Sequence, residues 1–196
     1  FLQTGRYNRN RSFYSTISPS MDILISSNLE RLLYDLTGDD QKVSSWMKQL
    51  AQDGCYEVDD QTLSQLKELF YAGYCDDADT KQTIQTTYEN LDYLCDPHTA
   101  VALHVYDQYV AETGDESPVV VVSTASPYKF SKSVLTALQP ACACEDEFQL
   151  VETLSEVTRT AVPQPIEALQ GKPVRFQENC TKEEMRSAVL RMLGLQ

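Results

Sequence analysis

Hydroxyl groups and one lysine follow a run of four valines in "VVVVSTASPYKFS", residues 119–131. Ser123 and Thr124 come directly after the valines, and Lys129 lies five residues further on. An unbroken valine run is typical of a central strand of a parallel sheet, which is covered on both faces. Ligands of such sheets bind beyond the carboxyl ends of the strands. These residues therefore predict an anion site here, with an ordinary Ser- and Thr-rich turn and a solvated Lys129 as the alternative.

A second group of polar residues lies in the N-terminal stretch "RYNRNRSFYSTISPSMDILISSNLER", residues 6–31. It gathers serines, threonine, asparagine and four arginines, and arginine pairs with phosphate through two parallel hydrogen bonds. This composition suits a phosphorylated small molecule. An exposed basic loop followed by helix-capping serines would look the same in the sequence.

The two histidines of the chain, His98 and His104, lie six residues apart on one expected helix. They do not share a face at i, i+4 spacing, so neither a histidine pair for zinc nor a catalytic triad is expected from this chain alone. His98 falls in the first helical turn, where free backbone N–H groups favour an anion. A histidine merely hydrogen-bonded at a helix start is the alternative, and His104 is expected in the core or at its rim.

Apolar residues recur at helical spacing along most of the chain. Capping pairs, Ser27 with Glu30 and Thr181 with Glu184, are expected to begin the first and last of these helices. The predicted amphipathic helices cover residues 26–38, 39–54, 59–73, 79–94, 145–158 and 181–193.

Three further segments complete the expected elements. The helix 96–114 is apolar on most sides from Ala100 to Val110 and is expected to be buried. A strand over 119–123 leads through the hydroxyl-rich loop into a helix over 131–138, and 172–176 is expected to form a short edge strand. These strands are too few for a whole doubly wound domain, so the sequence predicts either a mostly helical protein or a helix-rich part of a larger α/β fold whose other strands are missing.

Composition narrows the class of protein. The formal charge of −13 over 196 residues argues against a nucleic-acid partner, which needs clustered Lys and Arg. The six cysteines show no zinc spacing, and Cys142 and Cys144 are interpreted as ordinary thiols of a reduced, cytosolic protein with no metal. Only seven glycines are present, and no Gly-rich loop could cradle a phosphate.

Three blocks of the sequence resemble the C-terminal portion of threonine synthase, in its long microbial and fungal form. They are "TGRYNRNRSFYSTISPSMDILISSNLERLLYDLTG", "CDPHTAVA" and "VVVSTASPYKFSKSVL". The helices between them and the tail also fit, so the resemblance spans nearly the whole chain. Cys95, placed before the Asp-Pro-His-Thr turn, departs from the family's pattern.

The resemblance implies the tryptophan-synthase-β-like fold of pyridoxal-phosphate (PLP) enzymes of fold type II. It further implies the conversion of O-phospho-L-homoserine and water to threonine and phosphate. The hydroxyl of Thr124, with Ser123 as second choice, would meet the pyridine nitrogen of the cofactor, and Lys129 would lie near the substrate's phosphate or carboxylate. The same cleft would be lined by Ser18, Ser20, Asn28, Arg31, His98 and Thr99.

The family's Schiff-base lysine and its Gly- and Asn-rich phosphate loop belong to its N-terminal half, and neither motif is found here. We therefore expect an inactive C-terminal fragment of a cytoplasmic enzyme, without a catalytic lysine of its own. Residues 1–140 would belong to the large cofactor-binding domain, and 141–196 would form a helical extension packed on it. An apolar face left on 119–122 or 100–110 could drive self-association.

Two other interpretations remain. Lys129 could itself form the Schiff base of a small, complete pyridoxal enzyme, since a desolvated lysine can do so. Alternatively, the chain could be a helical interaction module without chemistry. A pure scaffold has no reason to gather hydroxyls, arginine and lysine at a strand end and a helix start, so their convergence on one site would distinguish the two.

Overall fold

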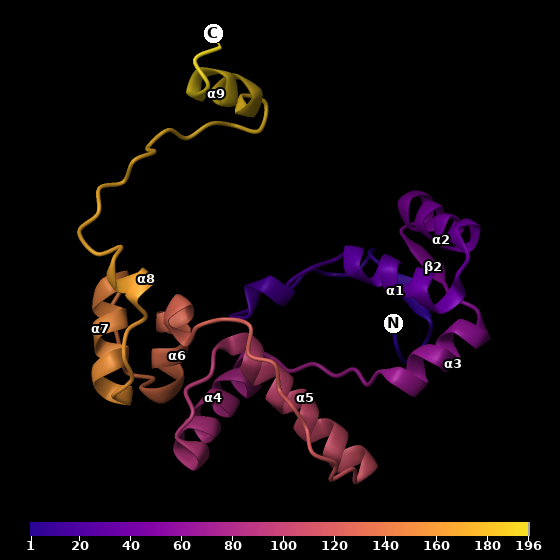
Figure 1. Cartoon of the computed structure of the whole chain (residues 1–196), viewed down its shortest axis with the longest axis horizontal. Helices are drawn as coiled ribbons and strands as arrows, with labels where there is room; N and C mark the ends of the chain where they lie inside the picture. The colour runs from indigo at the N-terminus through magenta and orange to yellow at the C-terminus, as the bar shows by residue number, and fades with distance from the viewer. Residues whose placement is uncertain (196) are drawn as a thin grey trace. The chain divides into compact units, whose positions relative to one another are not determined.

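A computed structural model describes residues 1–195 of the chain (Figure 1). The backbone divides into two compact units, one over residues 1–162 and a second from Pro163 onward. The helix-rich character expected from the sequence is confirmed, and the strands of the described residues form one small sheet.

The first part of the larger unit packs three helices against a two-stranded sheet. Helices α1 (Ser27–Thr37), α2 (Asp40–Asp53) and α3 (Asp60–Leu69) surround the antiparallel strands β1 (Arg6–Asn8) and β2 (Cys55–Glu57). The sequence did not predict these strands, because three residues are too few to show an alternating pattern. The core of this part consists of Leu33, Val43, Trp46, Leu50, Tyr56, Val58 and Leu66.

Aspartate side chains begin most of the helices. Each N-cap carboxylate accepts a hydrogen bond from a backbone N–H three residues later, as from Lys42 to Asp39 in α2 and from Thr62 to Asp59 in α3. The cap expected at Ser27 is wrong. The N-cap is Ser26, its side chain makes no capping bond, and Ser27 is the first helical residue.

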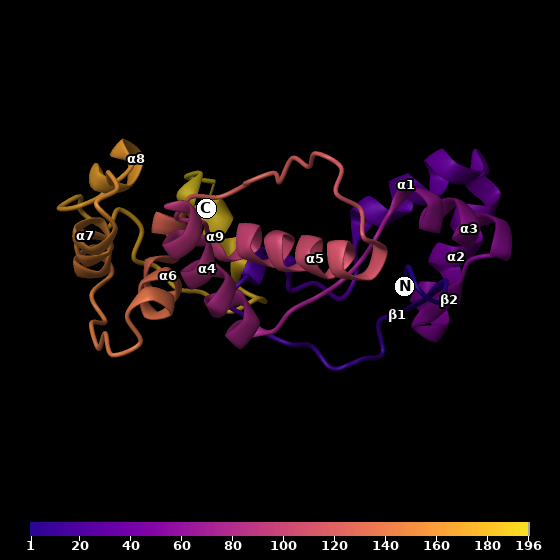
Figure 2. The ribbon, with the colours of Figure 1, turned by 90° about the horizontal axis from the view of Figure 1, so that it is seen from below.

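The second part of the larger unit is a group of packed helices. Helix α4 (Asp77–Leu91) packs against α5 (Pro97–Thr113) and α6 (Ser131–Leu138), and α6 packs against α7 (Glu147–Thr158) (Figures 1 and 2). The 3-10 helix η2 (Pro127–Phe130) leads into α6. The fully buried side chains of this second part are Ile84, Val134, Leu135, Leu150 and Leu154.

The predicted strand over 119–123 does not form. This segment runs back along α5 toward α6 in an irregular extended path (Figure 2), and Val120 is 87% exposed. A strand exists only through hydrogen bonds to a neighbouring strand, and no part of the described chain provides one here. The strand pair that does form, β1 with β2, is antiparallel. The edge strand expected over 172–176 does not form either, and this segment is irregular.

The expected burial of the helix around Ala100–Val110 is wrong as well. In α5 only Pro97, Thr99 and Ala100, all at its N-terminal end, are buried. One face of the helix packs on α4, while most residues from Val101 to Val110 are half-buried. Helix α5 therefore has more apolar surface than the rest of this chain covers.

The second unit contains the short helix α8 (Gln164–Glu167) and helix α9 (Met185–Met192). The expected capping pair makes its hydrogen bond, from the Thr181 N–H to the Glu184 carboxylate at 2.9 Å, but regular helix begins only at Met185. None of the helices described in either unit is long and apolar enough to cross a membrane.

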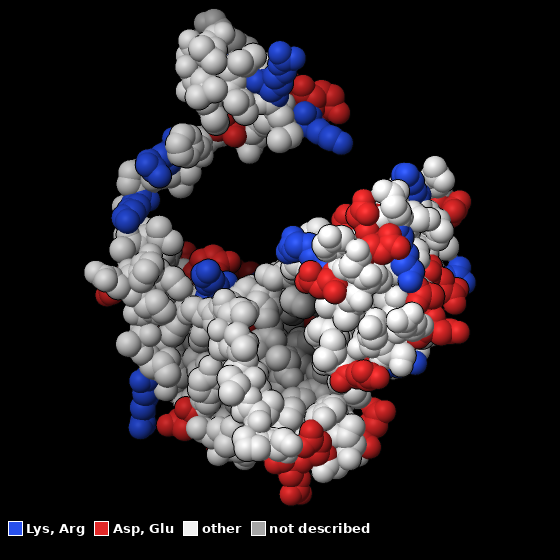
Figure 3. Space-filling view, turned by 45° about the vertical axis from the view of Figure 1, so that its right-hand side comes forward, with Lys and Arg blue, Asp and Glu red and all other residues white. Residues whose placement is uncertain are grey.

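Charged side chains, many of them acidic, crowd the surface over α1, α2 and α3 (Figure 3). The larger unit holds nearly all of the negative charge. Of the chain's 29 acidic and 16 basic residues, four acidic and five basic ones lie from Pro163 onward, which leaves 25 and 11 in residues 1–162. The acidic charge therefore belongs to the unit that carries the candidate site.

Candidate functional site

The structure brings two of the three sequence blocks together through Ser18 and His98. Ser18 lies in the loop just before the 3-10 helix η1 (Pro19–Met21), and His98 lies in the first turn of α5. The Ser18 Oγ and the His98 Nδ1 are 2.5 Å apart, although 80 residues separate them in the chain. Ser18 is only 4% exposed, so this contact is held inside the protein.

The loop around Ser18 is fixed by aspartates that the sequence did not single out. Thr16 donates its backbone N–H and its hydroxyl to Asp22, at 2.7 and 2.8 Å, and accepts the Ser18 N–H at 3.1 Å. The Ile17 N–H donates to Asp77 at the start of α4, at 3.1 Å. These hydrogen bonds fix the backbone on either side of Ser18 and therefore limit where its hydroxyl can lie.

A second contact joins α5 to the end of the valine segment. The Thr99 hydroxyl donates to the Asp96 Oδ2 at 2.5 Å, and its oxygen lies 3.1 Å from the Ser123 Oγ. Ser123 also donates to Asp96, at a long 3.5 Å. Asp96 is fully buried and accepts the backbone N–H groups of His98 and Thr99, at 2.8 and 3.3 Å.

Thr124, next to Ser123, has a free hydroxyl. The residue is exposed, and among the described residues its side chain makes no hydrogen bond, whereas the Ser123 hydroxyl already meets Thr99 and Asp96. The loop that follows Thr124 is anchored to the segment after α7, because the Tyr128 hydroxyl donates to the Thr160 carbonyl at 2.8 Å. Thr124 is therefore a polar group on a fixed support that is available to a ligand.

His98 has one polar atom without a partner. Its Nδ1 meets Ser18, while its Nε2 is buried and, within the described chain, makes no hydrogen bond. The Phe130 ring packs edge-on against the imidazole, with ring centroids 4.9 Å apart. One polar and one aromatic contact hold the histidine, and the polar contact is the one expected of a histidine hydrogen-bonded at a helix start.

Four predicted site residues lie outside this hydrogen-bonded group. Asn28 and Arg31 pair with each other on the exposed face of α1, and within residues 1–195 no hydrogen bond joins them to Ser18, His98 or Thr124. Ser20 and Lys129 are exposed. The convergence that the sequence suggested therefore holds for Ser18, His98, Thr99 and Ser123, with Thr124 present only as the chain neighbour of Ser123.

Asp96 belongs to the site although sequence reasoning treated it only as a helix cap. The sequence Asp-Pro-His-Thr indicates that Asp96 caps a helix. It does not indicate the link between Asp96 and Ser123, because 27 residues separate the two. Burial and this carboxylate also affect the neighbouring thiol. They raise the pKa of Cys95 to about 11, with burial as the larger cause.

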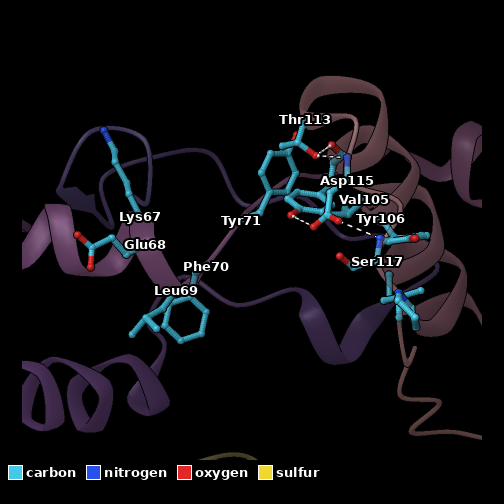
Figure 4. Close-up of a pocket in the computed structure, with 14 residues that line it drawn as sticks. Lys67, Glu68, Leu69, Phe70, Tyr71, Val105, Tyr106, Thr113, Asp115 and Ser117 are labelled. Carbon is cyan, nitrogen blue, oxygen red and sulfur yellow. Dashed lines mark hydrogen bonds between the residues drawn. The ribbon is translucent and has the colours of Figure 1, made fainter.

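Helix α5 also lines a groove that lies away from this site. A groove of about 600 Å³ lies at the C-terminal half of α5, between residues 67–71 and 113–119 (Figure 4). The Tyr71 and Tyr109 rings meet edge-on at 5.2 Å there, and the Tyr109 hydroxyl donates to Asp115 at 2.6 Å. Hydrogen bonds from Ser117 and, second to them, from the Tyr109 hydroxyl lower the pKa of Asp115 to about 2. Its aromatic and acidic lining does not suit a phosphorylated ligand.

Comparisons with known proteins agree with the resemblance of the three blocks. Residues 99–189 match the family model described as threonine synthase, C-terminal. Threonine synthase of Saccharomyces cerevisiae is 37% identical over 153 residues, which cover 70% of this chain and 30% of the yeast protein. Human threonine synthase-like 1 is 36% identical over 141 residues, covering 71% of this chain and 19% of that protein.

Solved structures give the same family. The crystal structure of threonine synthase from yeast superimposes with a TM-score of 0.79 at 28% identity, covering all of this chain and 40% of the yeast chain. PLP-bound threonine synthase from Brucella melitensis superimposes with a TM-score of 0.63 at 32% identity, over 81% of this chain and 38% of that one.

The chain spans about a third or less of the length of these curated relatives, 30% for the yeast enzyme and 19% for the human protein. Over that span the match includes the turn that carries Thr99, the valine segment and the loop with Thr124. The chain accordingly carries the C-terminal domain of the threonine synthase family and corresponds to the C-terminal portion of those enzymes.

Proposed function

We propose that this chain is the C-terminal part of a PLP-dependent threonine synthase, which converts O-phospho-L-homoserine and water to L-threonine and phosphate. The observation that carries the proposal is the free Thr124 hydroxyl beside a buried polar network, at the junction of the valine segment and α5. A helical interaction module would need no such network, whereas the position of Asn28 and Arg31 away from it is what that alternative expects.

The residues at this junction fit the pyridine ring of PLP. Its ring nitrogen needs a single hydrogen-bonding group, and Thr124 offers an uncommitted hydroxyl, while the Ser123 hydroxyl is already engaged. No carboxylate accompanies Thr124 in the loop, and the Asp96 carboxylate is enclosed by its own donors. Thr124 is therefore our choice over Ser123.

When bound, PLP supplies an electron sink for carbanion chemistry. Thr124 would orient the ring through a neutral hydrogen bond, which does not hold a proton on the ring nitrogen as a carboxylate would. The Ser18–His98 contact would fix the start of α5 against the loop before η1. The residues proposed to line the substrate's side of the same cleft are Ser18, Ser20, Asn28, Arg31, His98, Thr99 and Lys129.

We further propose that the Schiff-base lysine comes from sequence outside these 196 residues. Such a lysine needs a desolvated position in which it can lose its proton. Lys129 is exposed, and Lys132 hydrogen-bonds Glu145 at 2.5 Å, which raises the pKa of that lysine. On its own the chain would be inactive, and the N-terminal part of a threonine synthase would complete the site.

Three related proposals concern the molecule as a whole. Residues 1–140 are proposed to belong to the cofactor-binding domain, with 141–196 as an extension of it. A cytoplasmic location is in keeping with six free thiols. In isolation, the exposed valines of 119–122 are proposed to pair with those of a second copy of the chain.

Substitutions at Thr124 test the assignment in the complete protein. We expect Thr124→Val to weaken PLP binding about 3- to 10-fold, the effect of losing one hydrogen bond, and Thr124→Ser to restore it. The measurement is the dissociation constant of PLP from absorbance titrations. Equal affinity for the Val and Ser variants would remove Thr124 from the cofactor site.

A further inference from the structure

Two helices of this chain begin with the same arrangement of an aspartate and a threonine. In α3, Asp59 caps the helix and Thr62, three residues later, donates its hydroxyl to that carboxylate at 3.1 Å. In α5, Asp96 and Thr99 repeat the arrangement at 2.5 Å. Both threonines are buried, at 1% and 3% exposure. Capping alone therefore explains the features that these two pairs share.

The charge environments of the two aspartates differ. Asp59 is partly exposed and forms a salt bridge with Lys42 at 2.5 Å. Asp96 is fully buried, and no salt bridge reaches it from any described Lys, Arg or His. A buried carboxylate without a cation is costly unless several donors satisfy it. A solvent-facing cap of the α3 kind would begin α5 without that cost.

The Asp96 pair also has a third member, which the Asp59 pair lacks. Ser123 reaches both Thr99, at 3.1 Å, and Asp96, at 3.5 Å, from the far end of the valine segment. In the described chain this segment has no strand neighbour to fix it. These contacts therefore tie the backbone of Ser123, and with it the adjacent Thr124, to the rigid start of α5.

We propose that Asp96 and Thr99 are positioning residues, which hold the Ser123–Thr124 turn in the orientation that presents the Thr124 hydroxyl to the bound cofactor. The inference rests on the proposed function, because it assigns the purpose of the turn. Asp96 and Thr99 act through Ser123 and would not touch the cofactor themselves. The same network explains why Asp96 is buried without a cation.

The test compares Thr99→Val with Thr62→Val in the complete protein, since both remove a buried hydroxyl from an Asp-capped helix start. We expect Thr99→Val to raise the dissociation constant of PLP about 3- to 10-fold and to shift the absorbance of the bound cofactor. It should also speed hydrogen exchange in peptides covering residues 119–126. Thr62→Val should change none of these three properties, and Thr99→Ser should restore their wild-type values.

Ser123→Ala provides a second route if Thr99→Val does not fold, because Ser123 is exposed. It should reproduce the change in PLP binding, and where the double variant folds it should lose no more than either single variant. Additive effects, or equal behaviour of Thr99→Val and Thr62→Val, would overturn the proposal. If the wild-type protein binds no PLP, the proposed function fails, while the exchange measurement still decides whether Thr99 holds the turn.

Discussion

At the scale of single residues, Asp96 illustrates how one side chain can end a loop, begin a helix and reach a distant segment. Its carboxylate accepts two backbone N–H groups and the Thr99 hydroxyl, and it takes a further long hydrogen bond from Ser123. The local part of this role follows from the sequence, because Asp before Pro is a strong helix start. The distant part depends on how α5 and the valine segment lie together.

Cys95, immediately before Asp96, reports on the burial of this helix start. Its side chain is 1% exposed, and burial together with the Asp96 charge raises its pKa to about 11. At pH 8 only about one thiol in a thousand would then be ionised, and the thiolate is the reactive form. We expect iodoacetamide to modify Cys95 far more slowly than the exposed Cys180, as measured by mass spectrometry.

Equal labelling of Cys95 and Cys180 in the folded chain would contradict this burial. Denatured protein is the control, because both thiols should then react at similar rates. Raising the pH through 11 should narrow the difference, since deprotonation of Cys95 becomes easier while the fold persists.

At the scale of secondary-structure elements, helices were predictable and strands were not. The helices α2 and α7 end close to the expected residues, because caps and apolar stripes are local signals. Helix α3 ends at Leu69, before the expected Gly73, and α4 ends at Leu91, before the expected residue 94. A strand depends on its neighbour. The valines of 119–122 read as a strand, but without a partner they form none, whereas the three-residue strands β1 and β2 form because each has the other.

The same difference between local signals and contacts of distant segments applies to the candidate site. Ser123, Thr124 and His98 were singled out from their own places in the sequence. Ser18 belonged to the polar N-terminal group, and the role of Thr99 followed only from the resemblance to threonine synthase. The sequence could not show that Asn28 and Arg31, a pair three residues apart on α1, lie away from that group. Their separation from the group depends on packing between elements that are distant in the chain.

Two glycines that end neighbouring helices give a matched pair for stability. Gly38 after α1 and Gly54 after α2 are both left-handed, with φ of 61° and 75°. Alanine at Gly38 would meet no atom within 4 Å, so it should cost about 1–2 kcal/mol from backbone strain alone. Alanine at Gly54 would overlap the Asn10 amide and displace its hydrogen bond to the Asp53 carbonyl.

We expect Gly54→Ala to lower the free energy of unfolding by about 1 kcal/mol more than Gly38→Ala does, the usual worth of one hydrogen bond. Urea unfolding of the two variants, followed by circular dichroism, measures the difference. Equal losses would show that the Asn10 contact contributes nothing to the turn between α2 and β2.

At the scale of the whole molecule, apolar surface remains uncovered beside the candidate site. Val119, Val120 and Val122 are 50%, 87% and 70% exposed, and α5 is only half-buried along most of its length. In a complete enzyme, we propose, the N-terminal part covers these residues. In the isolated chain they leave a face suited to a second copy.

Sedimentation of the isolated chain tests that pairing. We expect association that increases with protein concentration and that Val120→Lys weakens, because it places a charge in the apolar face. Gln49→Lys, which adds the same charge on the exposed surface of α2, should leave association unchanged. A clean monomer at high concentration, or equal effects of the two substitutions, would contradict self-association through this face.

The relatives include both threonine synthases and a threonine synthase-like protein, so the reaction of the complete protein is the decisive property. The measurement is the amount of threonine and of inorganic phosphate formed from O-phospho-L-homoserine, with and without added PLP. We predict equal amounts of both products and a requirement for PLP. Release of phosphate without threonine, or no turnover of this substrate by PLP-loaded protein, would contradict the assignment.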